Sequence, residues 1–260
     1  MSNSPPIAGI ITPPDWYDPT PERFRDLATT PVRVQQTLMP AVSFDFSLDS
    51  IAASEPEMQV AARSLGRTGC KAIVLSGTPF TWAHDPTEAG ARALQARLSR
   101  AAGHIPFVFP GLAIVDACRS LGIKRPACCT TYYPADWRDG WAGFLRDCGL
   151  GPNVVLSMDQ LDMVPTINAV SEQGWTLSAD DIVASARAVR RADPDADGML
   201  ITGAGASTYG LINDMEREFG IPVIGADGAI LWGLARAMDI ELAYGCLGQV
   251  TNAPMPSPSA

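Results

Sequence analysis

The chain alternates short apolar runs with amphipathic stretches. The apolar runs are rich in β-branched residues and predict buried strands at residues 7–12, 32–39, 71–76, 105–109, 127–132, 153–157, 199–202 and 222–224. Between most of them, apolar residues recur three or four positions apart and predict helices at residues 57–65, 88–102, 112–121, 136–148, 179–191, 209–219 and 229–238. Strands buried on both faces that alternate with helices indicate a doubly wound α/β architecture with parallel sheets.

A weak internal repeat relates two parts of the chain. GCKAIVLSGT (69–78), followed by HIPFVFPGLAIVDACRSLGI (104–123), parallels ADGMLITGAG (196–205), followed by GIPVIGADGAILWGLARAMDI (220–240). In each half a strand ends in a Ser/Thr-Gly turn, and an Ile-Pro strand later leads through a glycine-containing turn into a helix. Because ligands of open α/β sheets bind at the carboxyl ends of strands, we expect the loops at 77–80 and 203–208 to line one cleft.

Composition and charge exclude several classes of partner. The 260 residues carry a formal net charge of −9, so no chain-wide basic field attracts nucleic acid or an anionic membrane. No apolar stretch approaches the ~20 residues of a membrane span, and the start of the chain lacks a signal-peptide pattern, which predicts a cytoplasmic protein. A homo-oligomer is compatible with this composition.

Cysteine and histidine usage predicts neither a metal site nor disulfides. The six cysteines have no CxxC spacing, and the chain has two histidines. We therefore expect reduced, buried thiols, and we expect the protein to work without a metal or another cofactor.

The segment LITGAGAST (200–208) admits three interpretations. Gly203 and Gly205, with Asp227 downstream, resemble a dinucleotide fingerprint, but the third small position is Thr208 and no Gly-Lys-Ser/Thr follows. The glycines could instead expose backbone N–H groups that stabilise a carboxylate or oxyanion. The plainest interpretation is a tight turn.

Several of these segments together resemble the aspartate/glutamate racemase superfamily, within it the branch of arylmalonate decarboxylase and maleate isomerase. The likeness runs through IAGIITPPDW (7–16), VLSGTPF (74–80), CTTYYPADW (129–137), DGMLITGAG (197–205) and GIPVIGADGAILW (220–232). It implies two Rossmann/flavodoxin-like lobes with parallel sheets, related by pseudo-two-fold symmetry around a cleft. We assign residues 1–115 and 226–250 to the first lobe, 116–225 to the second, and 251–260 to a flexible tail rich in Pro and Ser.

The resemblance also implies that the catalytic cysteines are missing. Each lobe of the family ordinarily supplies one cysteine from a strand-end loop, and here Gly77 and Gly203 occupy those positions. Racemisation or thiol-mediated isomerisation needs such a thiolate, so the sequence argues against a racemase.

The family's oxyanion-binding groups are carried over in part. Thr78 matches the family's Gly-Thr turn, although Pro79 removes a backbone donor there. The family's tyrosine matches Tyr132, with Tyr133 as a one-residue alternative, and the second-loop amides match Ala204 and Gly205. In the decarboxylase such groups bind the remaining carboxylate while the other departs from an apolar pocket.

The source of the returning proton stays open at this level. Tyr132, Tyr133, water or His84 could supply it, and Asp227 could act as a general base or as the N-cap of the following helix. The loop at 12–19 is expected over the cleft, where Pro14 and Trp16 would bind the substrate.

These observations favour a cofactor-independent lyase that decarboxylates a small carboxylate or carbonyl compound through a stabilised enolate. One alternative is a hydrolase or hydratase in which Asp227 or His84 activates water. Another is a cleft without catalytic activity that binds a carboxylate ligand.

Overall fold

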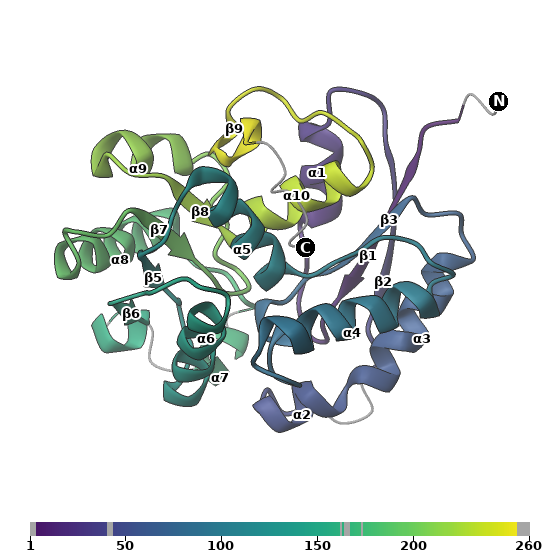
Figure 1. Cartoon of the computed structure of the whole chain (residues 1–260), viewed down its shortest axis with the longest axis horizontal. Helices are drawn as coiled ribbons and strands as arrows, with labels where there is room; N and C mark the ends of the chain where they lie inside the picture. Colours follow the sequence, from purple (N-terminus) through teal and green to yellow (C-terminus); the bar gives the residue numbers. More distant parts are fainter. Residues whose placement is uncertain (1–3, 41–43, 162, 164–166, 173, 254–260) are drawn as a thin grey trace.

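Two parallel sheets form the framework of the protein. The computed structural model describes residues 4–40, 44–161, 163, 167–172 and 174–253. The first sheet has the order β2-β1-β3-β4 and the second β6-β5-β7-β8, so each places its second strand outside its first. Figure 1 shows the labelled strands of the two sheets side by side, covered by helices. This confirms the α/β class and the parallel sheets.

The strands lie close to the predicted apolar runs. They are β1 (Ile7–Thr12), β2 (Arg33–Leu38), β3 (Ala72–Leu75), β4 (Phe107–Val108), β5 (Pro126–Cys129), β6 (Val155–Leu156), β7 (Gly198–Ile201), β8 (Val223–Gly225) and a further short strand, β9 (Cys246–Gln249). In the first sheet Ile11 pairs with Leu75, and in the second Cys129 pairs with Ile201. The carboxyl ends of the central strands therefore lie together in each sheet.

The helices follow the amphipathic stretches. They are α1 (Thr20–Leu27), α2 (Leu48–Ala53), α3 (Glu55–Gly66), α4 (Glu88–Ala101), α5 (Pro110–Leu121), α6 (Ala135–Asp147), α7 (Ile167–Glu172), α8 (Ala179–Ala192), α9 (Ile212–Phe219) and α10 (Ala226–Ala237), with 3₁₀ turns η1 (Thr78–Thr81), η2 (Met158–Leu161) and η3 (Val250–Asn252). Helix α4 begins where the Thr87 side chain accepts from the Gly90 N–H, and α5 ends at Gly122, which has φ 73°.

Helices α5 and α10 connect the two sheets. They pack against each other, and α10 also contacts β3 and β4 of the first sheet and β8 of the second. Residues 250–252 form η3 and Ala253 is buried, so the segment predicted as a tail begins within this turn. The rest of that tail, 254–260, lies outside the described residues.

One predicted strand is too long. The apolar run at 127–132 leaves the sheet after Cys129 because Thr131 adopts φ 40°, a left-handed conformation that ends strand geometry. After this turn, Tyr132 and Tyr133 line a cavity together with Gly77 and Thr78, which follow β3 of the first sheet.

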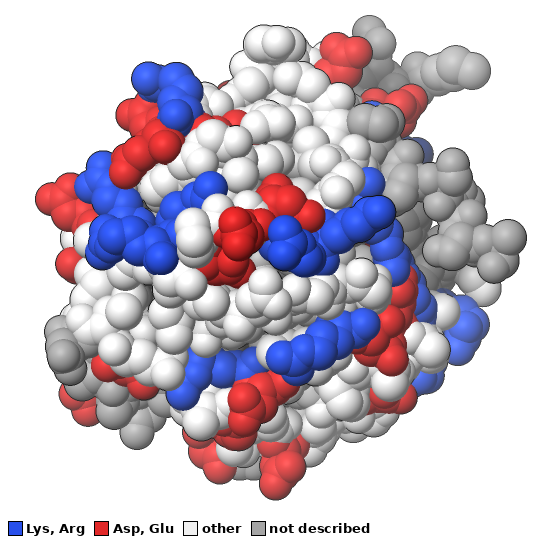
Figure 2. Space-filling view, turned by 60° about the vertical axis from the view of Figure 1, so that its left-hand side comes forward, with Lys and Arg blue, Asp and Glu red and all other residues white. Residues whose placement is uncertain are grey.

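One face of the molecule mixes both signs of charge. On the face drawn in Figure 2, basic and acidic side chains alternate among uncharged areas. Within the described residues, no helix combines the length and apolar character that crossing a membrane would require.

Candidate active site

Two adjoining cavities lie at the strand ends. The larger has a volume of about 260 Å³ and the smaller about 50 Å³. Six residues line both cavities and form their junction: Trp16, Gly77, Thr78, Trp175, Gly203 and Ala204. The predicted loops at 77–80 and 203–208 therefore meet at one site, together with Trp16 of the N-terminal loop.

The two cavities have different walls. The larger is lined by the N-terminal loop and α1, by residues 174–177, by residues 203–207 and by α10. The smaller has aromatic and aliphatic walls from Phe44, Phe46, Ile51, Phe80 and Trp137, and it also touches Pro14, Pro79 and both tyrosines. The site therefore has a small apolar end and a roomier end open to more polar groups.

Tyr132 reaches across from β5 to the glycine loop after β7. Its hydroxyl oxygen accepts a hydrogen bond of 2.6 Å from the Ala204 N–H. Burial raises the pKa of Tyr132 well above its ordinary value, and the neighbouring Tyr133 raises it further. Tyr132 is therefore protonated near neutral pH, and its O–H can donate to a ligand.

The glycine loop contributes a second donor. Gly205 has φ 80°, and its backbone lies so close to that of Trp175 that an added Cβ would lie 1.9 Å from the Trp175 carbonyl oxygen. Among the described residues, no acceptor receives the Gly205 N–H. The Gly205 N–H is therefore available to a ligand in the larger cavity, whose wall includes Gly205.

Three buried hydroxyl groups gather beneath the junction. Ser76, Tyr133 and Thr202 each have a side-chain oxygen that finds no hydrogen-bond partner within the described part of the chain. Burial raises the pKa of Tyr133, while the facing hydroxyls of Thr202 and Thr78 oppose that rise. Buried polar groups are normally satisfied, so these hydroxyls are suited to a ligand oxygen or to a proton transfer.

Gly77 and Thr78 follow β3 in the opposite wall. An added Cβ at Gly77 would lie 2.6 Å from the Phe80 ring and 3.1 Å from Pro13. Thr78 is buried and begins η1, and Pro79 follows it without an N–H to donate. The Thr78 hydroxyl is thus the side-chain donor that this wall offers at the junction.

Asp227 holds the glycine loop rather than facing free solvent. Its carboxylate accepts from the Thr208 N–H (2.8 Å), the Thr208 hydroxyl (2.5 Å) and the Gly228 N–H (2.9 Å). Burial raises its pKa, and the Thr208 donors oppose the rise. The predicted N-cap position is wrong, because Gly225 is the N-cap and Asp227 lies in the first turn of α10. Asp227 lines the larger cavity, and both of its oxygens accept from these donors.

His84 lies apart from both cavities. It follows η1, its side chain is 44% exposed, and its Nε2 lies 3.9 Å from a Glu55 carboxylate oxygen. It lines neither cavity. The placement corrects the expectation that His84 could serve as proton donor or water-activating base, since it is not in contact with the site.

The six cysteines lie away from the site. None of them lines either cavity, and five are buried while Cys246 is partly buried. Burial raises the pKa of each thiol. The arrangement therefore supplies no thiolate to the two cavities.

Sequence reasoning missed two groups in the walls. Trp175 lines both cavities, contacts Tyr132 edge to face with ring centroids 5.3 Å apart, and has φ 57°. Arg23, on α1, lines the larger cavity. The Gly174-Trp175 pair, at a turn before a helix, was a detectable signal, whereas α1 has two apolar residues at helical spacing, Phe24 and Leu27, which is too few for a prediction from periodicity.

Comparisons with known proteins agree with this architecture. A family model described as arylmalonate decarboxylase matches residues 42–251. The arylmalonate decarboxylase of Bordetella bronchiseptica is 29% identical over 175 residues, 67% of this chain and 68% of that protein. A crystal structure of arylmalonate decarboxylase has a TM-score of 0.75 at 23% identity, covering 96% of this chain and 100% of that one.

Maleate isomerases share the fold at lower identity. The maleate cis-trans isomerase of Nocardia farcinica has a TM-score of 0.78 at 16% identity, covering 95% of this chain and 97% of that one. The maleate isomerase of Pseudomonas putida S16 has a TM-score of 0.76, also at 16% identity, covering 95% and 100%.

Proposed function

Because the chain belongs to the arylmalonate decarboxylase family, an enzyme family, we propose that it is a lyase that removes carbon dioxide from a small malonate-type acid. The observation that carries this proposal is the set of donors around the cavity junction: Thr78 and Ala204 line both cavities, and Tyr132, in the wall of the smaller one, contacts the Ala204 amide. No cysteine accompanies them in the cavity walls.

The donors would stabilise the charge that develops during decarboxylation. When the bond between the α-carbon and one carboxyl carbon breaks, its electron pair delocalises into the remaining carboxylate as an enediolate. The Tyr132 and Thr78 hydroxyls and the Gly205 N–H can donate to those oxygens, and removing one such donor typically lowers kcat about 10²–10³-fold. This stabilisation of the enediolate requires no side-chain base.

The smaller cavity suits the departing carboxylate. Its walls include Phe44, Phe46, Phe80 and Trp137. A carboxylate loses much of its hydration against these aromatic rings, which is costly, whereas neutral carbon dioxide loses little. Placing one carboxylate there and the other at the junction leaves the larger cavity for the substituent on the α-carbon.

Tyr133 is the group that we assign to the return of the proton. Its buried hydroxyl faces the hydroxyls of Thr78 and Thr202 without forming a hydrogen bond of ordinary geometry within the described residues, and Tyr133 lines the smaller cavity. It would transfer its proton to the α-carbon of the enediolate, leaving a phenolate that takes a proton from water. The products are carbon dioxide and a monocarboxylate with one new C–H bond.

Carbon dioxide release from a panel of substituted malonates tests the proposal. We expect turnover that falls at least 10²-fold in Thr78→Ala and Tyr132→Phe, with Tyr244→Phe, an exposed tyrosine, as the matched control. In Tyr133→Phe we expect slow turnover and, in D₂O, loss of any preference for one enantiomer of the deuterated product. Full activity in Thr78→Ala and Tyr132→Phe would refute the donor assignment, and ¹⁸O from labelled water in the product would indicate hydration instead.

A further inference from the structure

Arg23 places a positive charge in the wall of the larger cavity. It lies on α1, is partly buried, and its guanidinium carbon sits 4.3 Å from the centroid of the Tyr209 ring. Tyr209 follows the glycine loop that ends β7. Arg23 therefore bridges α1 and that loop beside the site.

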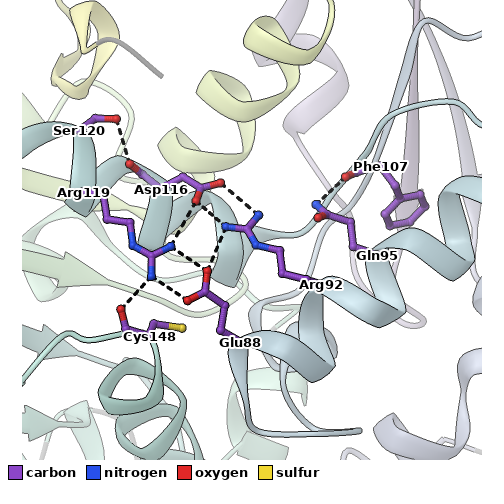
Figure 3. Close-up of polar contacts among 8 residues, drawn as sticks. All are labelled: Glu88, Arg92, Gln95, Phe107, Asp116, Arg119, Ser120 and Cys148. Atoms are coloured by element: carbon purple, nitrogen blue, oxygen red, sulfur yellow. Dashed lines mark hydrogen bonds and ion pairs between the residues drawn. The ribbon is translucent and has the colours of Figure 1, made fainter. Parts of the chain in front are cut away.

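The other partly buried arginines are bound to polar partners. Figure 3 shows Arg92 and Arg119 between Glu88 and Asp116. The remaining members of this group bind carboxylates or backbone carbonyls; they are Arg97, Arg138 and Arg190. Among the described residues, Arg23 is the partly buried arginine whose guanidinium has neither a hydrogen bond nor an ion pair. Its N–H groups are available to a ligand.

The contact with Tyr209 favours a planar anionic ligand. The guanidinium carbon lies over the Tyr209 ring, and the N–H groups of a planar guanidinium can form a two-pronged hydrogen bond with a carboxylate. Asp227 is the other charged residue in this wall, and its oxygens already accept from Thr208 and Gly228. The charge in the larger cavity that lacks a protein partner is therefore positive.

Arg23 lies on the side where the substituent of the substrate would extend. Thr78 and Ala204 line both cavities, whereas Arg23 lines only the larger one. A substrate held by its α-carboxylate at the junction would therefore direct its substituent toward Arg23. The walls between them include Trp16, Ile230 and Leu231, which suit an apolar or aromatic spacer.

We propose that Arg23 binds a second carboxylate at the far end of the substrate, so that the substrate class is a malonate-type acid whose α-substituent is an apolar spacer ending in a carboxylate. This inference rests on the proposed function for the identity of the reacting group. The binding of the terminal carboxylate can be measured without turnover.

Calorimetric titration with two unreactive product-like acids tests the binding step. The probes are phenylacetate and 4-carboxyphenylacetate, which differ in the terminal carboxylate alone. We expect the dicarboxylate to bind about 10–100-fold more tightly to the unmodified protein. Arg23→Gln should abolish that preference and Arg23→Lys should retain part of it. Arg25→Gln, an exposed neighbour on α1 that lines neither cavity, should keep it.

The outcomes separate this inference from the proposed function. Equal binding of the two probes to the unmodified protein, or a preference that survives Arg23→Gln, overturns the assignment of Arg23. If Arg23 only holds Tyr209, its variants will lower the melting temperature without altering the ratio of the two dissociation constants. Carbon dioxide release from the matching phenylmalonates is measured separately, so a preserved binding preference without turnover would overturn the proposed function alone.

Discussion

The Thr131 hydroxyl occupies the space that a side chain at position 203, just after β7, would need. The Thr131 hydroxyl donates to the Thr202 carbonyl at 2.8 Å. A Cβ added at Gly203 would lie 1.9 Å from that hydroxyl oxygen, and Gly203 has φ 125°, which side-chain-bearing residues rarely adopt. The backbone conformation and the neighbouring Thr131 therefore disfavour a cysteine side chain at position 203.

We predict that Gly203→Cys alone destabilises the protein by on the order of 3 kcal/mol, through overpacking and backbone strain. Thr131→Ala removes the clashing oxygen, so the double variant should recover part of this loss. Urea unfolding of the two single variants and the double variant measures the coupling. Strictly additive effects would show that Thr131 does not restrict position 203.

The residues of the site were only partly predictable from sequence. The repeat and the family resemblance identified Gly77, Thr78 and the 203–205 loop, which the structure brings to one junction. The bond between Tyr132 and Ala204 depends on the left-handed turn at Thr131, for which the apolar run gave no signal. His84 was attractive for its intrinsic pKa, but its position depends on packing that periodicity does not describe.

At the scale of elements, a charged cluster joins three helices outside the site. Glu88, at the start of α4, receives a two-pronged hydrogen bond from Arg119 of α5, with both N···O distances 2.7 Å. Arg119 also donates to the Cys148 carbonyl after α6, and Arg92 binds Asp116 (Figure 3). The Arg119 and Arg92 guanidinium groups lower the pKa of Glu88.

We predict that Glu88→Gln lowers the free energy of unfolding by about 1–2 kcal/mol at pH 7. The folded-state pKa of Glu88 is below its ordinary value of 4.5, so its stabilisation is complete above that value and is lost as the pH falls through the lowered pKa. The difference between the unmodified protein and the variant should therefore shrink in acid. Urea unfolding at pH 7 and at pH 3 measures it, and a difference of equal size at both would contradict the ionic origin.

The type and order of the helices and strands could be predicted wherever the pattern of apolar and polar positions was long. A strand buried on both faces gives a continuous apolar run, and a helix buried on one face gives apolar residues three or four positions apart. These two patterns predicted the strands of the two sheets and the longer helices. Helices α1, α2 and α7 were missed. Helix α9, as long as α1, was predicted because three apolar residues recur three or four apart in it, whereas α1 has two, Phe24 and Leu27. Two of the missed residues that line the larger cavity, Arg23 and Trp175, lie on or near such short elements.

At the scale of the whole molecule, Trp82 packs between a segment that follows the first sheet and a helix that belongs to the second. It follows η1, which carries Thr78 from the first sheet, and it is buried against α6, which follows β5 of the second. A Cβ added at Gly140 of α6 would lie 2.5 Å from the Trp82 ring, whereas one added at Gly143 meets nothing within 4 Å. The repeat predicted two similar halves, but such a contact between them depends on three-dimensional packing.

We predict opposite effects for two glycine substitutions on this helix. Gly143→Ala should raise the free energy of unfolding by about 0.5–1 kcal/mol, because alanine favours helix and no neighbour obstructs it. Gly140→Ala should lower it by about 1–2 kcal/mol, because the buried Trp82 ring must move. That movement would also displace η1 and separate Thr78 from Tyr132. Carbon dioxide release should therefore fall in Gly140→Ala and stay unchanged in Gly143→Ala; equal stability and activity in the two variants would show that the Trp82 contact does not set the geometry between the sheets.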